Sequence, residues 1–156
     1  MSNLTGKITR HPFFNGMKPE HMALAADCVR EAAYQPGETL IRAGEPADSF
    51  FLIESGRVAL EAHEPADGNV LIQELGIGEV LGWSWLFPPF SWQFTARAIE
   101  PTTVLVLSGA HLLVEAEKNH DFGFELMKRV SQVAIRRLQA TRKRLLDAHL
   151  QSLLEG

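Results

Sequence analysis

The sequence lacks the residues that mark membrane-spanning, secreted or disulfide-bonded proteins. It contains one cysteine, Cys28, so no internal disulfide can form, and a lone thiol is typical of a reducing compartment. No run of about 18 apolar residues is present, which argues against a transmembrane helix. Residues 1–10 also lack the apolar core of a secretory signal peptide. We therefore expect a cytoplasmic protein without a membrane span.

The residue patterns of enzymes and metal sites are also missing. The six histidines are scattered, and His63 has no second histidine two residues away, so the ligand spacing of a zinc or cupin-type site is absent. Neither a Gly-x-Ser-x-Gly motif nor a phosphate loop occurs. We expect no enzyme activity, no metal and no cofactor.

Charge divides the chain into two parts. Residues 1–124 carry 8 Lys and Arg against 16 Asp and Glu, whereas residues 125–156 carry 7 against 3. The acidic part is not suited to bind nucleic acid. The basic residues of the second part are those of a solvated helix face or of a surface for an acidic partner or nucleic acid. We predict a body, residues 1–124, followed by a C-terminal helix, residues 125–156.

Short apolar runs separated by turn residues occupy the chain from Gly37 to Leu107. Such short strands, with turns every eight to twelve residues, are typical of an antiparallel sandwich, barrel or jelly roll. Before them, Pro19 is suited to begin a helix of about 14 residues, and residues 1–17 show little pattern. The predicted strands are 39–41, 49–53, 57–61, 70–72, 95–99 and 103–107.

A long helix is predicted at the C-terminal end. A short helix opens at Ser108 and runs to about Lys118, and Asp121 is a plausible N-cap for a second helix of roughly 25 to 30 residues. Apolar and small residues recur in this second helix at spacings of three and four, which predicts a coiled-coil seam. We expect a homodimer through this seam; packing of the helix against its own domain is the alternative. The seam consists of Met127, Val130, Ala134, Leu138, Thr141, Leu145 and Ala148.

Aromatic residues are concentrated between Gly76 and Ala98. This stretch holds all three tryptophans, three of the nine phenylalanines, three of the twelve glycines and a Pro-Pro pair. Aromatic surface and turn residues in so short a span predict either a binding pocket or a packed plug.

The order of elements resembles the cyclic nucleotide-binding domain of the catabolite activator and fumarate–nitrate regulator family. The resemblance covers about residues 10–150 and is most specific in Pro36-Gly37-Glu38, Gly44-Glu45-Pro46-Ala47-Asp48, Phe51-Leu52-Ile53, Ser55-Gly56 and Val58. It implies a mainly β protein: an eight-stranded antiparallel jelly roll with flanking helices, a phosphate-binding cassette and a dimerising C-terminal helix.

The cassette departs from the family pattern at the two positions that carry charge. In the family a Glu accepts from the ribose hydroxyl and an Arg pairs with the cyclic phosphate. With Gly82 as the cassette glycine, Trp83 stands at the Glu position and Trp92 at the Arg position. A second register, with Gly78-Glu79 as the cassette pair, would keep the ribose acceptor. Arg97 lies on the opposite face of its strand from Trp92 by alternation, so we predict a surface or ion-paired role for Arg97.

Two interpretations of the aromatic set are open. Its members fill the former pocket as core, or an apolar or aromatic ligand stacks between Trp83 and Trp92 with polar contacts from Ser84 and Gln93. The ligand-pocket candidates are Gly82, Trp83, Ser84, Trp85, Trp92 and Gln93.

Three functions follow from the resemblance. The first is a stand-alone regulatory or sensor module that does not bind cyclic AMP in the usual way and signals through its helix to a partner. The second is a ligand-free interaction module, and the third a true cyclic nucleotide-binding protein. Family members read DNA with a helix-turn-helix domain that follows the long helix. Because this chain stops at Gly156, we expect no direct sequence-specific DNA binding.

Overall fold

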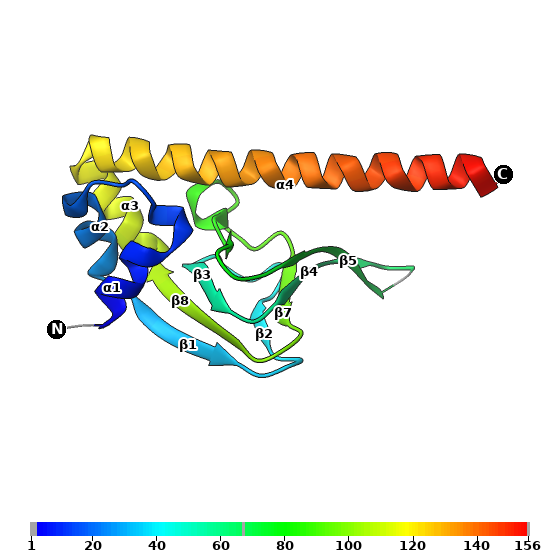
Figure 1. Ribbon diagram of the computed structural model, residues 1–156, viewed down its shortest axis with the longest axis horizontal. Helices are drawn as coiled ribbons and strands as arrows, with labels where there is room; N and C mark the ends of the chain where they lie inside the picture. The colour runs from blue at the N-terminus through cyan, green and yellow to red at the C-terminus, as the bar shows by residue number, and fades with distance from the viewer. Residues whose placement is uncertain (1–2, 67, 156) are drawn as a thin grey trace.

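The computed structural model describes residues 3–66 and 68–155, and Figure 1 shows three short helices gathered at one end of a β-roll with a long helix running past it. Two four-stranded antiparallel sheets form the roll, in the orders β1-β8-β3-β6 and β2-β7-β4-β5. The predicted antiparallel jelly roll with flanking helices is therefore confirmed.

The first sheet consists of β1 (Arg30–Tyr34), β3 (Ser49–Ser55), β6 (Val80–Leu81) and β8 (Thr102–Ser108). The second consists of β2 (Thr39–Ile41), β4 (Val58–Glu64), β5 (Gly68–Leu75) and β7 (Thr95–Ala98). Their facing side chains make one apolar core, and residues 50–53 of β3 are all buried. Helices cover the outer side of the first sheet, so this central strand is apolar on both faces.

Six helical elements lie in the described part of the chain, besides the strands. Two of them, the 3₁₀ helices η1 and η2, are single turns that each place aromatic side chains in the core. The helical elements are α1 (Asn3–Arg10), η1 (Pro12–Phe14), α2 (Pro19–Ala26), η2 (Ser84–Leu86), α3 (Gly109–Lys118) and α4 (His120–Glu155).

Two local predictions are wrong. The helix that begins at Pro19 ends at Ala26, and the rest of the predicted helix forms a turn at 27–29 and the beginning of strand β1. Pairing of β1 with β8, from Arg30 opposite Val106 to Tyr34 opposite Thr102, outweighs the helix propensity of two alanines in this segment. The cap of α4 is not Asp121 but Asn119, whose Oδ1 accepts the N–H of Phe122 at 3.1 Å.

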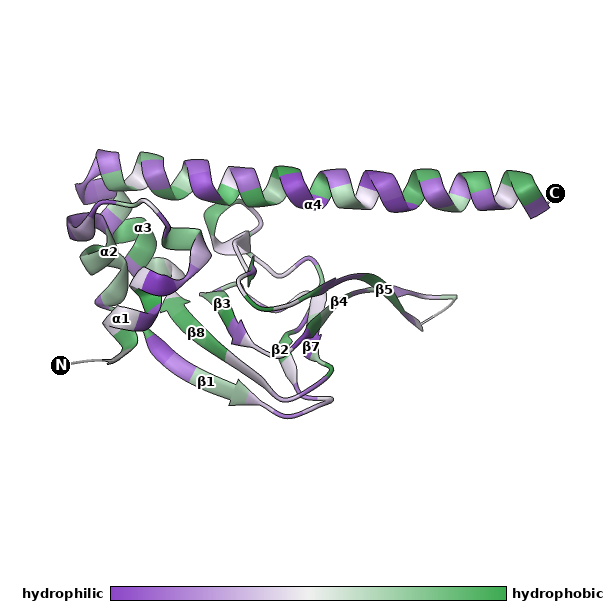
Figure 2. Ribbon diagram, in the orientation of Figure 1, coloured by the Kyte–Doolittle hydropathy of each residue, from purple (hydrophilic) through white to green (hydrophobic). Residues whose placement is uncertain are grey.

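The long helix α4 has two different halves. Its first half packs on the roll through Phe122, Leu126, Val130 and Val133, which are buried in the same core cluster as the strands. Its second half extends beyond the roll (Figure 1), and Leu138 and Leu145 are each 68% exposed. Figure 2 shows apolar bands recurring along α4 to its C-terminal end. Among the described residues, no helix has the length and apolar character that a membrane crossing requires.

Candidate functional site: an aromatic cassette beneath the long helix

The cassette, Gly76 to Ala98, contains a tight turn at Gly82 whose backbone conformation favours glycine. Gly82 has a φ of +90°, and a Cβ there would lie 2.8 Å from the backbone oxygen of Ser49 and 3.2 Å from the Trp92 ring. Gly78, with a φ of +84°, shapes the preceding turn, which Glu79 closes by accepting the N–H of Gly76 at 2.9 Å. Close packing of strand β3 and an indole therefore explains the glycine at position 82.

Trp85 is a core residue. Its side chain is 3% exposed, and its Nε1 donates to the carbonyl of Gly82 at 2.6 Å. Its ring meets Phe50 edge-on at 6.1 Å and covers Gly109, where a Cβ would lie 2.6 Å from Cγ of Trp85. The indole N–H is thus satisfied inside the protein, as buried tryptophans require.

Trp92, at the position where the family resemblance places an arginine, is also buried. It is 5% exposed and packs on Phe51 with the ring centroids 6.5 Å apart. Its backbone is fixed to the turn before β3: its carbonyl accepts from Gly44 at 2.8 Å, and its N–H donates to Glu45 at 2.9 Å.

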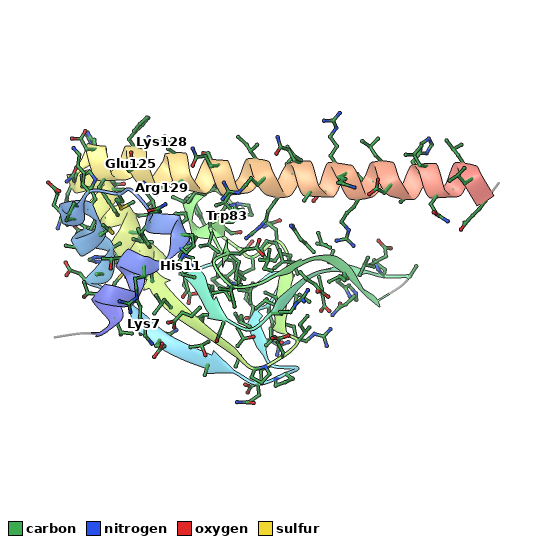
Figure 3. All side chains as sticks on the ribbon, in the orientation of Figure 1. Lys7, His11, Trp83, Glu125, Lys128 and Arg129 are labelled. Atoms are coloured by element: carbon green, nitrogen blue, oxygen red, sulfur yellow. The ribbon has the colours of Figure 1, made fainter. Side chains whose placement is uncertain are left out.

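Trp83, at the position of the family glutamate, lies between the roll and α4 (Figure 3). The guanidinium of Arg137, from α4, stands 4.8 Å from the centre of the Trp83 ring and donates a hydrogen bond to the carbonyl of Val80. Burial lowers the pKa of Arg137 to about 10, so this residue stays charged at neutral pH. A half-buried cation–π contact and a charge-assisted hydrogen bond therefore hold α4 to the start of the cassette.

The remaining candidates are polar and lie nearer the surface. Ser84 begins η2 and is half-buried, whereas Gln93 is exposed and donates to the carbonyl of Ser91 at 2.9 Å. Arg97 pairs with the buried Glu61 on the outer face of the second sheet, which confirms its predicted ion-paired role. The structure thus brings Trp83, Trp85 and Trp92 around one glycine but leaves Gln93 outside.

From the sequence, Arg137 is expected only among the basic residues of the C-terminal helix. The spacing along the helix could have revealed its contact with the roll. Arg137 follows Val130 by seven residues and Val133 by four, so it lies on the same, buried face of α4. No group of three His, Cys, Asp or Glu side chains suited to a metal ion occurs within residues 3–66 and 68–155.

A jelly roll with a glycine-rich cassette beneath a C-terminal helix defines a regulatory domain of a known class. The profile of the cyclic nucleotide-binding domain matches residues 31–119. The chain belongs to the cyclic nucleotide-binding domain family.

Several known proteins resemble this chain. The acetyltransferase Pat of Mycolicibacterium smegmatis is 37% identical over 89 residues, which are 57% of this chain and 26% of the acetyltransferase. A CRP-like cAMP-activated global transcriptional regulator of Mycobacterium tuberculosis is 23% identical over 141 residues, 90% of this chain and 61% of the regulator. The chain thus spans about a quarter of the first of these relatives and less than two thirds of the second.

Solved structures show the same fold. A candidate cyclic nucleotide-binding protein from Geobacter metallireducens superimposes with a TM-score of 0.78 at 25% identity, covering 88% of this chain and 99% of that one. A cyclic nucleotide-binding domain from Methylobacillus flagellatus gives a TM-score of 0.82 at 21% identity, covering 94% and 84%.

Proposed function

We propose that this chain is a regulatory module whose cassette is filled by its own aromatic side chains and which does not bind cyclic AMP in the usual way. The observation that carries the proposal is the burial of Trp92 between Phe51 and Gly82. An anionic phosphate at this position would meet an indole instead of a guanidinium.

The nearby arginines do not replace the missing charge. Arg97 is engaged by Glu61 on the outer face of the second sheet, and Arg137 is held by Val80 and Trp83. A charge-assisted hydrogen bond contributes about 1.5–3 kcal/mol, so the loss of two weakens binding by roughly 10² to 10⁴. We infer that cyclic nucleotides bind in the millimolar range or not at all.

The output of the module is α4. Arg137 connects the cassette to this helix, and the exposed leucines beyond it offer a surface for a second copy of the chain and for a partner protein. The names of the relatives support a regulatory role, since they include a transcriptional regulator and a kinase regulatory subunit. We propose no catalytic role for this chain.

Titration calorimetry with cyclic AMP and cyclic GMP tests the proposal. We expect no binding with a dissociation constant below about 1 mM; a micromolar dissociation constant for the unaltered protein would contradict the proposal.

A thermal-shift screen with apolar and aromatic metabolites tests the alternative that the module senses a small molecule bound in the cassette. Stabilisation by one compound, lost in Trp92→Ala and kept in the exposed control Gln93→Ala, would place a ligand in the cassette and refute the self-filled pocket.

A further inference from the structure

A cavity beside α4 borders the start of the cassette, at Gly78 to Val80, and lies apart from the cassette tryptophans. It has a volume of about 220 Å³ and is lined by the η1 turn, by β5 and the turn that follows it, and by α4. Gln73, Gly78 and Val80 line one wall and Val133, Arg136 and Arg137 the other, whereas neither Trp83 nor Trp92 reaches it.

Neither arginine of this cavity makes a contact ion pair with a described residue. Nη2 of Arg137 donates to the carbonyl of Val80, but its Nη1 is buried and has no hydrogen-bond partner among the described residues. Burial lowers the pKa of Arg137, and the charge of Glu79 opposes this shift only in part. A buried guanidinium N–H without an acceptor is costly unless a ligand supplies one.

Glu79 is the one acidic residue among those that line the cavity. One of its carboxylate oxygens accepts the N–H of Gly76 at 2.9 Å, so this oxygen serves the turn. Two guanidinium groups against one carboxylate leave the lining positive. Water in the cavity could accept from Nη1 of Arg137 but would not neutralise the charge.

We propose that this cavity binds a small oxyanion, a phosphate or a carboxylate, against Arg136 and Arg137. The volume of about 220 Å³ exceeds the roughly 150 Å³ that accommodates benzene and falls below the roughly 300 Å³ where pockets for drug-sized ligands begin. A whole cyclic nucleotide is therefore too large for it. An anion in this cavity would join α4 to the β5–β6 turn and to the N-terminal segment at η1.

Inorganic phosphate and succinate, each titrated into the full chain at constant ionic strength, test the site by calorimetry and thermal shift. We expect saturable binding of at least one of them, weakened about 10- to 100-fold in Arg136→Gln. Arg136 is exposed, so this variant should fold as the unaltered protein does. Arg137→Gln should lose the same affinity, and Arg142→Gln, an exposed arginine of α4 outside the cavity, should keep it.

Two outcomes would overturn the site: no saturable binding of phosphate or succinate, or an equal loss of affinity in Arg136→Gln and Arg142→Gln, which would indicate nonspecific attraction to the basic helix. The anion site and the proposed function can fail separately. Trp92→Ala alters the aromatic part of the cassette, on which the proposed function rests, and should leave the affinity for phosphate unchanged. Loss of phosphate binding in Trp92→Ala alone would also contradict a separate site.

Discussion

At the scale of single residues, glycines decide how the tryptophans fit. Trp92 lies against Gly82 and Trp85 against Gly109. A Cβ at Gly109 would overlap the Trp85 ring at 2.6 Å, and one at Gly82 would stand in tight contact with the Trp92 ring at 3.2 Å. Each indole therefore fills space that a side chain on the neighbouring strand or helix would otherwise occupy. These two pairs place Trp85 and Trp92 in the close-packed core.

Comparison of Gly82→Ala with Gly44→Ala separates the cost of crowding the Trp92 ring and β3 from the cost of backbone strain at a positive φ. Both glycines have a φ near +90°, but only Gly82 has atoms that a Cβ would meet. We expect Gly44→Ala to lower the free energy of unfolding by about 1–2 kcal/mol and Gly82→Ala to lower it by about 1–3 kcal/mol more. Urea denaturation measures both. Equal losses would show that Trp92 and β3 yield freely to the added methyl group.

His11 makes stability depend on pH. Its Nδ1 accepts the N–H of Phe13 at 3.2 Å, so its proton is on Nε2, 3.2 Å from the carbonyl of Ile53. Burial lowers the pKa of His11, and the bond to Ile53 opposes this shift only in part. Above the ordinary pKa of about 6.5, His11 is neutral in both states and its contribution is complete. As pH falls below 6.5, the unfolded state takes up the proton first and stability declines until the folded pKa is passed.

His11→Asn isolates this effect, because the amide oxygen can still cap η1 but does not titrate. Between pH 6.5 and 5, we expect the unfolding free energy of the unaltered protein to fall more steeply than that of the variant, by at most about 1.4 kcal/mol per pH unit. His149→Asn, on the exposed end of α4, is the control and should keep the original slope. Identical slopes for the unaltered protein and His11→Asn would contradict the role of His11.

At the scale of elements, α4 is divided at Arg137. Before it, Val130 and Val133 complete the core; after it, Leu138 and Leu145 are exposed. Of the predicted seam, Val130 therefore packs on its own domain, whereas Met127 before it and Leu138 and Leu145 after it are exposed and free to meet a second copy. Ala134 and Thr141 are half-buried and Ala148 is exposed.

Leu138→Glu/Leu145→Glu tests the dimer that we propose for this seam. Because two carboxylates in an apolar interface are costly, we expect sedimentation to show a shift from dimer to monomer while the thermal unfolding of the roll changes little. Gln132→Glu/Gln139→Glu changes the charge equally on the opposite face of α4 and should leave the mass unchanged. A Leu138→Glu/Leu145→Glu variant of unaltered mass would rule out the seam.

Six of the eight strands could be predicted from the sequence because their apolar runs are bounded by Gly and Pro turns. Strand β1 could not, since its Arg-Glu-Ala-Ala-Tyr sequence favours a helix until β8 is present to pair with it. Strand β6 is only two residues long and has no pattern of its own. Neither α1 nor η1 was foreseen, because their packing depends on the roll and on α4.

At the scale of the whole molecule, the family resemblance predicted the roll, the cassette and the long helix together. It also located Trp83 and Trp92, but it did not show that Arg137 crosses from α4 to meet Trp83. A contact between residues this far apart in the chain depends on the angle at which the helix lies on the roll. The proposed division between residues 124 and 125 falls inside α4, whose buried residues up to Val133 share the core of the body.

The helix α4 runs unbroken from His120 to Glu155, so we propose that it moves as a rigid rod that pivots at Arg137, like a lever at its fulcrum. From Arg137 to Glu155 the arm is roughly 27 Å long, and a tilt of about 10° at the fulcrum would carry its tip about 5 Å. Side-chain adjustments beside the cassette or the arginine-lined cavity would thus be magnified at the far end, where a partner could detect them without touching the roll.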